Sequence, residues 1–271
     1  MPSLRPLVLM VFGAVIACAS PAVADQRSDF IAGLTKDCPG CDLHGVNKKR
    51  ADLRGAKLAG ANLKDANFHN ANLTGADLSG ADLSMANMNI ALLQNANLKN
   101  ANLTGVMLYG ARANRANFEN SNLTGILAKL IDLTHADLAG ATMVNADVRL
   151  GRLADAKLTH VDMTRGLGDD ANFSGVDFSG ATLTNGSLQR AQLRGANFSG
   201  TKAEGLDLIG ADMREVTLAG ADLSGSRLFQ AQLLPEDMAG ANVRNAILPN
   251  GQTGQGIAPT PPPAVTPAPQ D

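Results

Sequence analysis

Residues 51–80 read ADLRGAKLAGANLKDANFHNANLTGADLSG, and this stretch decides the fold. It consists of six five-residue repeats in which alanine, a polar residue and a large apolar residue recur in the same order. The same phase continues from Cys41 to Asn250, giving 42 repeats whose central positions are 43, 48, 53 and so on to 248. Because Leu, Phe, Met or Val holds 37 of the 42 centres, one register holds throughout residues 41–250.

A period of five fits neither an α-helix, which repeats every 3.6 residues, nor a β-strand, which repeats every two. It fits a coil that turns a corner every five residues and points the same two positions inward. The large central side chain would fill the interior, and the residue two places earlier, alanine in 26 of 42 repeats, would lie where room is scarce. The Asn, Asp and Gly residues between centres are typical of turns. Four corners would close a square coil, and coils would stack at about 4.8 Å.

The recurring motif Ala-Asn/Asp-Leu-x-x, as in Ala61-Asn62-Leu63, resembles that of the pentapeptide repeat family. The resemblance implies an all-β fold, a right-handed quadrilateral β-helix solenoid of about ten coils and on the order of 50 Å in length. We expect residues 41–250 to form this solenoid, with a short helical cap before it. Each coil would contact only its neighbours, so stability would accumulate one interface at a time.

A few repeats depart from the apolar rule at the centre. We expect Lys48 to lie in the first coil, where the interior at the end of the solenoid can contact water. Gly166 and Gly168 occupy both inward positions of one repeat, which predicts a loosened corner there. The five exceptional centres are Lys48, Ala113, Ala128, Gly168 and Ala203.

Residues 1–24 have the features of a secretory signal peptide. The apolar run Leu7–Ala17 is too short to span a bilayer, and the small residues at 22–24 predict cleavage after Ala24. This interpretation predicts a periplasmic or secreted protein. The alternative is a lipoprotein signal in which Cys18 is lipidated, which would make the chain an outer-membrane lipoprotein and is the only membrane contact we expect.

Residues 25–40 are expected to form an N-terminal cap, because the first coil of a solenoid exposes apolar side chains and unpaired backbone. Within this segment, residues 28–36 predict a short amphipathic helical turn that Ser28 or Asp29 could cap. Three apolar side chains would plug the first coil: Phe30, Ile31 and Leu34.

Residues 251–271 contain six prolines among small polar residues, which predicts an extended, disordered tail. The sequence shows no C-terminal counterpart of the N-terminal cap. An uncapped last coil could pair with the last coil of a second copy of the chain, so we expect a homodimer through the C-terminal coil.

Cys38 and Cys41 form the one cysteine motif, Cys-Pro-Gly-Cys, and both fall on inward phases of the repeat. Outside the cytoplasm such a pair is expected to form a structural disulfide. Buried free thiols are the first alternative. A metal or redox role is the second, although a thioredoxin-like pair needs a helix after a strand and His44 leaves a zinc set incomplete.

Composition and motifs point away from catalysis and nucleic-acid binding. The net charge is −2 and aromatic residues make up 3% of the chain, so neither a phosphate-binding surface nor a stacking platform is expected. Most Asp residues occupy turn positions of the repeat. His69, His135 and His160 are isolated on outward positions, and no phosphate-binding glycine loop is present in the sequence. We therefore expect no enzyme, no catalytic or metal residues and no cofactor.

Large apolar residues are unevenly distributed over the outward positions. Of fourteen, ten fall on the side whose centres are 48, 68, 88 and so on. Because contiguous exposed apolar surface marks contact sites, we expect this face to bind a partner, a second copy or the chain's own tail. The alternative is that some, especially Leu127 beside Ala128, turn inward. The ten are Ile90, Met107, Tyr109, Leu127, Leu130, Leu150, Leu167, Ile209, Phe229 and Ile247.

These observations predict an exported, non-catalytic scaffold that mediates protein interaction or has a structural role in the cell envelope. Its protein partner cannot be read from the sequence. The alternative function comes from the family resemblance, since some relatives mimic DNA and bind a topoisomerase. The export signal and the nearly balanced charge argue against that alternative, because a DNA mimic needs a continuous negative field.

Overall fold

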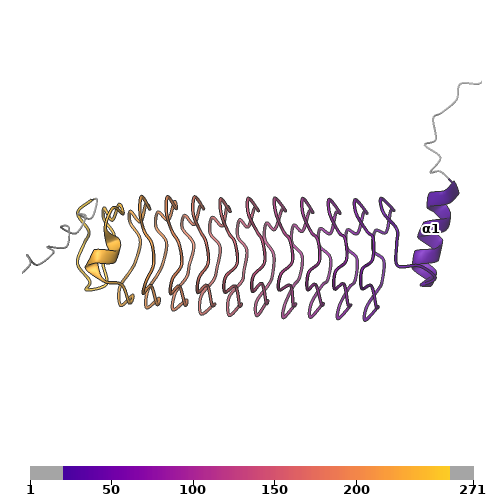
Figure 1. Ribbon diagram of the computed structural model, residues 1–271, viewed down its shortest axis with the longest axis horizontal. Coiled ribbons are helices and arrows are strands. Elements are labelled where there is room, and N and C mark those ends of the chain that lie inside the picture. Colours follow the sequence, from indigo (N-terminus) through magenta and orange to yellow (C-terminus); the bar gives the residue numbers. More distant parts are fainter. Residues whose placement is uncertain (1–20, 257–271) are drawn as a thin grey trace, which may run out of the picture.

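The computed structural model describes the backbone of residues 21–256 and the side chains of residues 25–256. This part of the chain contains one α-helix, α1 (Pro21–Ala32), then a long stack of coils interrupted by a 3-10 helix, η1 (Pro235–Met238). Figure 1 shows the coils as a straight rod, with α1 lying across one end and η1 near the other. The lipidation candidate Cys18 and most of the predicted signal peptide lie outside the described residues, and the predicted cleavage position after Ala24 falls within α1.

Each coil contains 20 residues, and successive coils pair in parallel. Residues preceding the centres form bridges to the residue 20 positions later, as between Asp42 and Asn62 or between Asp137 and Lys157. The backbone N–H of Leu43 donates to the carbonyl of Asn62 at 2.7 Å, and the same bond recurs along the rod. This register agrees with the predicted four-sided coil. Continuous strands are absent from residues 21–256, because each side turns after five residues and its pairing is a single bridge.

The centres line a continuous apolar shaft. Of the 42 centres, 40 are buried, and only Lys48 and Leu248, near the two ends, are partly exposed. Burying one leucine stabilises a fold by roughly 1.5–3 kcal/mol, so the shaft supplies most of the favourable free energy of folding. Aromatic centres stack within it: the ring of Phe178 lies 5.5 Å from that of Phe173 and 5.1 Å from that of Phe198. The predicted inward phase agrees with this burial.

The corners depend on turn-forming side chains and on left-handed backbone. The Oδ1 atom of Asp77 accepts the N–H of Ser79 at 3.1 Å, and Asn97 from the next coil donates to the same oxygen at 3.0 Å. Two residues after nearly every centre the backbone turns left-handed, with φ of 65° at Gly55. Asn and Asp therefore recur before the centre because they bond both within and between coils.

The corner at Gly166 and Gly168 is not loosened, so that prediction was wrong. The N–H of Gly166 donates to Met163 at 2.9 Å, and the N–H of Gly168 donates to Ser187 at 2.7 Å, as in regular repeats. A Cβ atom on Gly168 would lie 2.7 Å from Leu188 and 2.8 Å from Phe173. Neighbouring side chains therefore fill the space that a larger centre would occupy.

The helix of the N-terminal cap starts and ends earlier than the predicted turn over residues 28–36, and only one of the three expected plug residues is buried. Helix α1 begins at Pro21, a residue type favoured in the first turn, and ends before Gly33, whose φ is 79°. Ser28 lies inside the helix and does not cap it. Phe30 is fully buried, whereas Ile31 on α1 and Leu34 just after it are exposed.

Lys48 has a specific role that its place in the repeat did not predict. Its Nζ atom donates to the carbonyls of Phe30 and Ile31 in the last turn of α1 and lies 4.6 Å from the centre of the Phe30 ring. A cation is favourable at a helix C-terminus and over an aromatic face. Partial burial lowers the pKa of Lys48. At this centre the charged side chain of Lys48 replaces an apolar one and binds α1 to the first coil.

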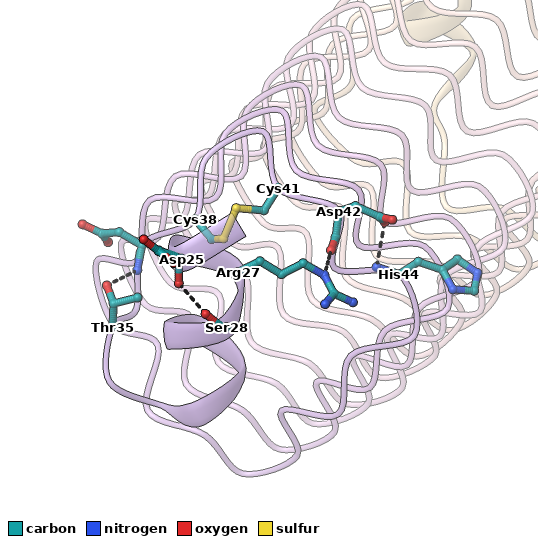
Figure 2. Close-up of a disulfide and its surroundings, with 9 residues drawn as sticks. Asp25, Arg27, Ser28, Thr35, Cys38, Cys41, Asp42 and His44 are labelled. Atoms are coloured by element: carbon teal, nitrogen blue, oxygen red, sulfur yellow. Dashed lines mark hydrogen bonds between the residues drawn. A yellow bond between two sulfur atoms is a disulfide. The ribbon is translucent and has the colours of Figure 1, made fainter. Parts of the chain in front are cut away.

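A disulfide joins Cys38 to Cys41 at the start of the first coil, with both side chains buried (Figure 2). Their Cα atoms are 5.4 Å apart. Beside the disulfide, the Nε atom of Arg27 donates to the carbonyl of Asp42 at 2.7 Å and ties α1 to the rod (Figure 2). The first coil is thus held by a covalent bond, a cation and a helix.

Near the other end, η1 replaces one regular repeat. Glu236 falls on the small inward position, where a carboxylate cannot be buried, and Pro235 lacks the N–H that the turn requires. The chain forms a 3-10 turn instead, and Met238 still reaches the shaft. The bridge expected between Thr217 and residue 237 is absent from the described ladder.

Residues 251–256 fold back on the last coil, so the prediction of a disordered tail beginning at 251 was wrong for these six. The N–H groups of Val243, Asn245 and Leu248 donate to carbonyls of this segment at 2.8–3.0 Å, and Ile247 forms an antiparallel bridge with Thr253. Unpaired donors of the last coil are satisfied in this way. Residues 257–271 lie outside the described part, and the homodimer through the C-terminal coil stays a prediction.

We predict that Leu138→Asp, near the middle of the shaft, lowers the free energy of unfolding by at least about 3 kcal/mol, because it places a charge in a dry interior. Leu130→Asp makes the same change at an exposed corner and should be nearly neutral. Thermal unfolding followed by circular dichroism compares the two variants. Equal melting temperatures would contradict the inward assignment of residue 138.

We predict that reduction of the Cys38–Cys41 disulfide destabilises the first coil by about 2 kcal/mol, since it closes a short loop. The effect should be local, because coils contact only their neighbours. Hydrogen exchange should therefore accelerate in residues 38–60 and stay unchanged beyond residue 100. Cys38→Ser/Cys41→Ser should reproduce the pattern without reductant. Uniform acceleration along the rod would show that the disulfide acts globally.

Candidate functional site

The ten apolar residues predicted on one side of the rod do lie outside the shaft, and we call them the apolar stripe. The most exposed are Leu127 at 56%, Tyr109 at 51% and Leu150 at 50% of their full accessible surface. Leu127 does not turn inward beside Ala128, so that alternative is not supported. Three stripe residues are half-buried, Met107, Leu167 and Ile209, and seven are exposed: Ile90, Tyr109, Leu127, Leu130, Leu150, Phe229 and Ile247.

The stripe is dense over four consecutive coils and sparse beyond them. Met107 and Leu127 are bridge partners on adjacent coils, so their side chains stand next to one another on the surface. With Tyr109 they line an open groove of about 330 Å³, which is also lined by the polar residues Asn89, Lys129 and Asp147. Towards the C-terminal end the stripe is continued by three more residues, Ile209, Phe229 and Ile247.

Three stripe residues occupy backbone positions that disfavour their side chains. Ile90, Leu130 and Leu150 lie at left-handed corners, with φ of 52°, 62° and 59°. Gly and Asn hold many of the other corners, and among the described residues Ile90 is the only β-branched side chain at such a φ. The left-handed conformation costs roughly 1–2 kcal/mol for such residues. Their exposure means that little burial offsets this cost.

Several aspartates beside and beyond the stripe are paired with arginines. Arg149 holds Asp147 with two bonds, at 2.8 Å from Nε and 2.6 Å from Nη2, and this hydrogen bonding lowers the pKa of the Asp147 carboxyl. Arg214 lowers the pKa of Asp212 in the same way, and Arg190 that of Asp170. These aspartates are stabilised in the charged form, which does not suit a general acid. The pairing also interrupts the negative field that a DNA mimic would need.

The His, Cys, Asp and Glu side chains within residues 25–256 form no metal-binding cluster. No group of three or more His, Cys, Asp or Glu residues in this part could hold a metal ion. His44 lies 3.2 Å from Asp65, and His135 lies 3.7 Å from Asp155; both pairs are exposed. Of the helices that the structure describes, none has the length and apolar character to cross a membrane.

The stacked 20-residue coils, the filled shaft and the single-bridge ladder define a four-sided β-helical solenoid. The chain belongs to the pentapeptide repeat family, whose members fold as right-handed quadrilateral β-helices. A family model described as pentapeptide repeats matches in eight copies, over residues 49–84, 86–125, 131–167, 152–190, 169–200 and 191–230.

Solved structures with a similar fold include other pentapeptide repeat proteins. HetL from Nostoc, involved in heterocyst differentiation regulation, is 22% identical, covering 84% of this chain and 97% of its own, with a TM-score of 0.27. A protein from the Arabidopsis thaliana thylakoid lumen is 41% identical, covering 33% of this chain and 59% of its own, with a TM-score of 0.27. QnrB1, a plasmid-mediated fluoroquinolone resistance protein, is 21% identical, covering 64% of this chain and 84% of its own, with a TM-score of 0.34. At these scores the likenesses carry no argument about function.

Among curated protein sequences, none matches this chain. The candidate site therefore rests on its own geometry.

One exposed residue next to the stripe was not included in the sequence prediction. Met85 is 57% exposed at the corner just before the side that carries the stripe, and its sulfur covers Gly105 of the next coil. The sequence feature that could have identified Met85 is its position at a corner of the repeat.

We predict that Ile90→Asn/Leu130→Asn/Leu150→Asn lowers the free energy of unfolding by no more than about 1 kcal/mol, because relief of backbone strain offsets the lost partial burial. Asn already holds corners at 70, 95, 120 and 145. Chemical denaturation measures the change. A loss as large as that of a shaft variant would show that these side chains stabilise the rod and that the stripe is structural.

Proposed function

We propose that this protein is an exported, non-catalytic pentapeptide-repeat scaffold that binds a protein partner through the apolar stripe. The carrying observation is that seven large apolar side chains are exposed on one of four sides, three of them at strained corners. Contiguous exposed apolar surface is uncommon on soluble proteins outside contact sites.

The shape of the stripe suits an elongated partner. It is one repeat wide, dense over the four coils from Ile90 to Leu150 (roughly 20 Å), and interrupted between Leu167 and Ile209, where Ser187, Gln189 and Arg190 occupy the same side. A long, narrow apolar track fits an extended segment or the apolar face of a helix. The coils beneath it are joined by hydrogen bonds at every step, so the stripe is presented on a rigid support.

The proposed export from the cytoplasm is supported by two features of the N-terminal region. Residues 1–24 resemble a signal peptide, and the Cys38–Cys41 disulfide is of a kind that persists in oxidising compartments. Cleavage after Ala24 would release the protein into the periplasm or medium, whereas lipidation of Cys18 would hold it at the outer membrane. Nothing in the paired charges of the rod favours the DNA-mimic alternative.

Site-specific photo-cross-linking in intact cells tests the interaction. A benzophenone amino acid at Tyr109 or Leu127 should give cross-linked species of increased mass that contain a partner protein. Ala139, at the same repeat position as Tyr109 but on the opposite side, is the matched control and should give none. The Ile90→Asn/Leu130→Asn/Leu150→Asn background should abolish the product. Equal cross-linking at 109 and 139, or none at the stripe, would reject the proposal.

A further inference from the structure

The N-terminal end of the rod differs in charge from the rest. Residues 36–64 contain seven Lys or Arg against three Asp, whereas residues 65–256 contain 14 Lys or Arg against 19 Asp or Glu. The cap residues 25–35 add Arg27 against Asp25 and Asp29, so this end keeps a net charge of +3. The molecule is therefore polarised along its axis although its total charge is only −2.

Four of these seven cations are available to a ligand. Lys48 is bound to the carbonyls of α1, and Lys36 and Arg54 both pair with Asp52, at 3.5 and 2.7 Å. The remaining four are exposed and form no ion pair within the described residues. They lie on three sides of the first coils and together form what we call the basic collar: Lys49, Arg50, Lys57 and Lys64.

An apolar tip lies beside the basic collar. Leu34, just after α1, is 78% exposed, the highest value among the large apolar residues described, and Ile31 is 48% exposed. Phe30 is fully buried and serves as the plug, so neither exposed residue is needed to close the first coil. Figure 1 places α1 at the extreme end of the rod, where nothing in the described chain covers it.

We propose that the N-terminal end of the rod docks on an anionic phospholipid surface. Ile31 and Leu34 would enter the headgroup boundary, and the basic collar would face the lipid phosphates. Apolar side chains ringed by Lys and Arg are the general design of interfacial anchors, and clusters of four or more cations bind anionic lipid. A nucleic acid would instead need cations along a groove and stacking aromatic rings, and no aromatic side chain is exposed at this end among the described residues.

This docking does not require a lipidated Cys18, which was the only membrane contact expected from the sequence. It is also independent of the apolar stripe, because the stripe begins at Ile90, more than one coil beyond Lys64. A rod held by its end would project the stripe away from the membrane.

Vesicle flotation tests the proposal with the full chain carrying Cys18→Ser, exported and purified from the periplasm, so that no lipid anchor contributes. The protein should float with vesicles of equal parts phosphatidylcholine and phosphatidylglycerol and not with phosphatidylcholine alone. Binding should be lost in molar salt, where charges are screened within about 3 Å. Equal binding to both vesicle types, or none to either, would overturn the proposal.

Two variants separate the basic collar from the overall charge. Lys49→Ser/Arg50→Asn/Lys57→Ser/Lys64→Ser should weaken binding to the mixed vesicles by at least about 50-fold. The control Arg112→Ser/Arg115→Asn/Arg152→Ser/Arg244→Ser removes the same charge from exposed, unpaired sites further along the rod and should weaken it far less. Equal weakening by both would mean that only net charge matters and would overturn the assignment to the collar.

A third variant tests the apolar tip. Ile31→Ser/Leu34→Ser should reduce binding to the mixed vesicles while leaving the melting temperature unchanged, because both side chains are exposed. Binding that is unaffected by this variant, together with equally tight binding of soluble polyphosphate, would show that the ligand is a free polyanion and would overturn the membrane assignment.

Discussion

A dry shaft that must be filled in every repeat is the constraint on which the rest of this structure depends. Each coil is closed by four corners, and a single bridge per side cannot hold it without apolar contact along the axis. The free energy of folding therefore comes from the centres, and the backbone ladder sets the spacing at which they stack. Even the glycine centre at 168 obeys this rule, because Leu188 and Phe173 occupy its space.

The same constraint leaves the outside of the rod free to vary. Three of the five positions in each repeat point away from the shaft, and they vary more widely within the demands of the turn bonds and the left-handed corners. On this chain they carry two different surfaces, the apolar stripe on one side and the basic collar at the N-terminal end. The stripe is accommodated at a cost, since three of its residues take left-handed corners that Gly or Asn would adopt more readily. Together the two surfaces suggest a molecule held by one end that offers one side to a partner.

The ends follow different rules from the middle, and there the sequence interpretation was least accurate. Periodicity predicts a residue's environment only where a coil lies on both sides. Lys48 was therefore expected to be a solvated end residue, although it fastens α1 through the carbonyls of Phe30 and Ile31. Composition predicted disorder from residue 251, yet residues 251–256 pair with the last coil because its unpaired donors attract any chain that can reach them.

The sequence by itself determined the period, the inward phase and the side of the rod on which the apolar residues gather, because each follows from counting in fives. It also brought Cys38 and Cys41 to inward positions of one turn. Only the tertiary structure decided which outward side chains are exposed, which cations are already paired and which corners are strained. Those properties depend on contacts between residues 20 positions apart and between the rod and its caps, and a local repeat pattern does not specify the conformations of long side chains that make them.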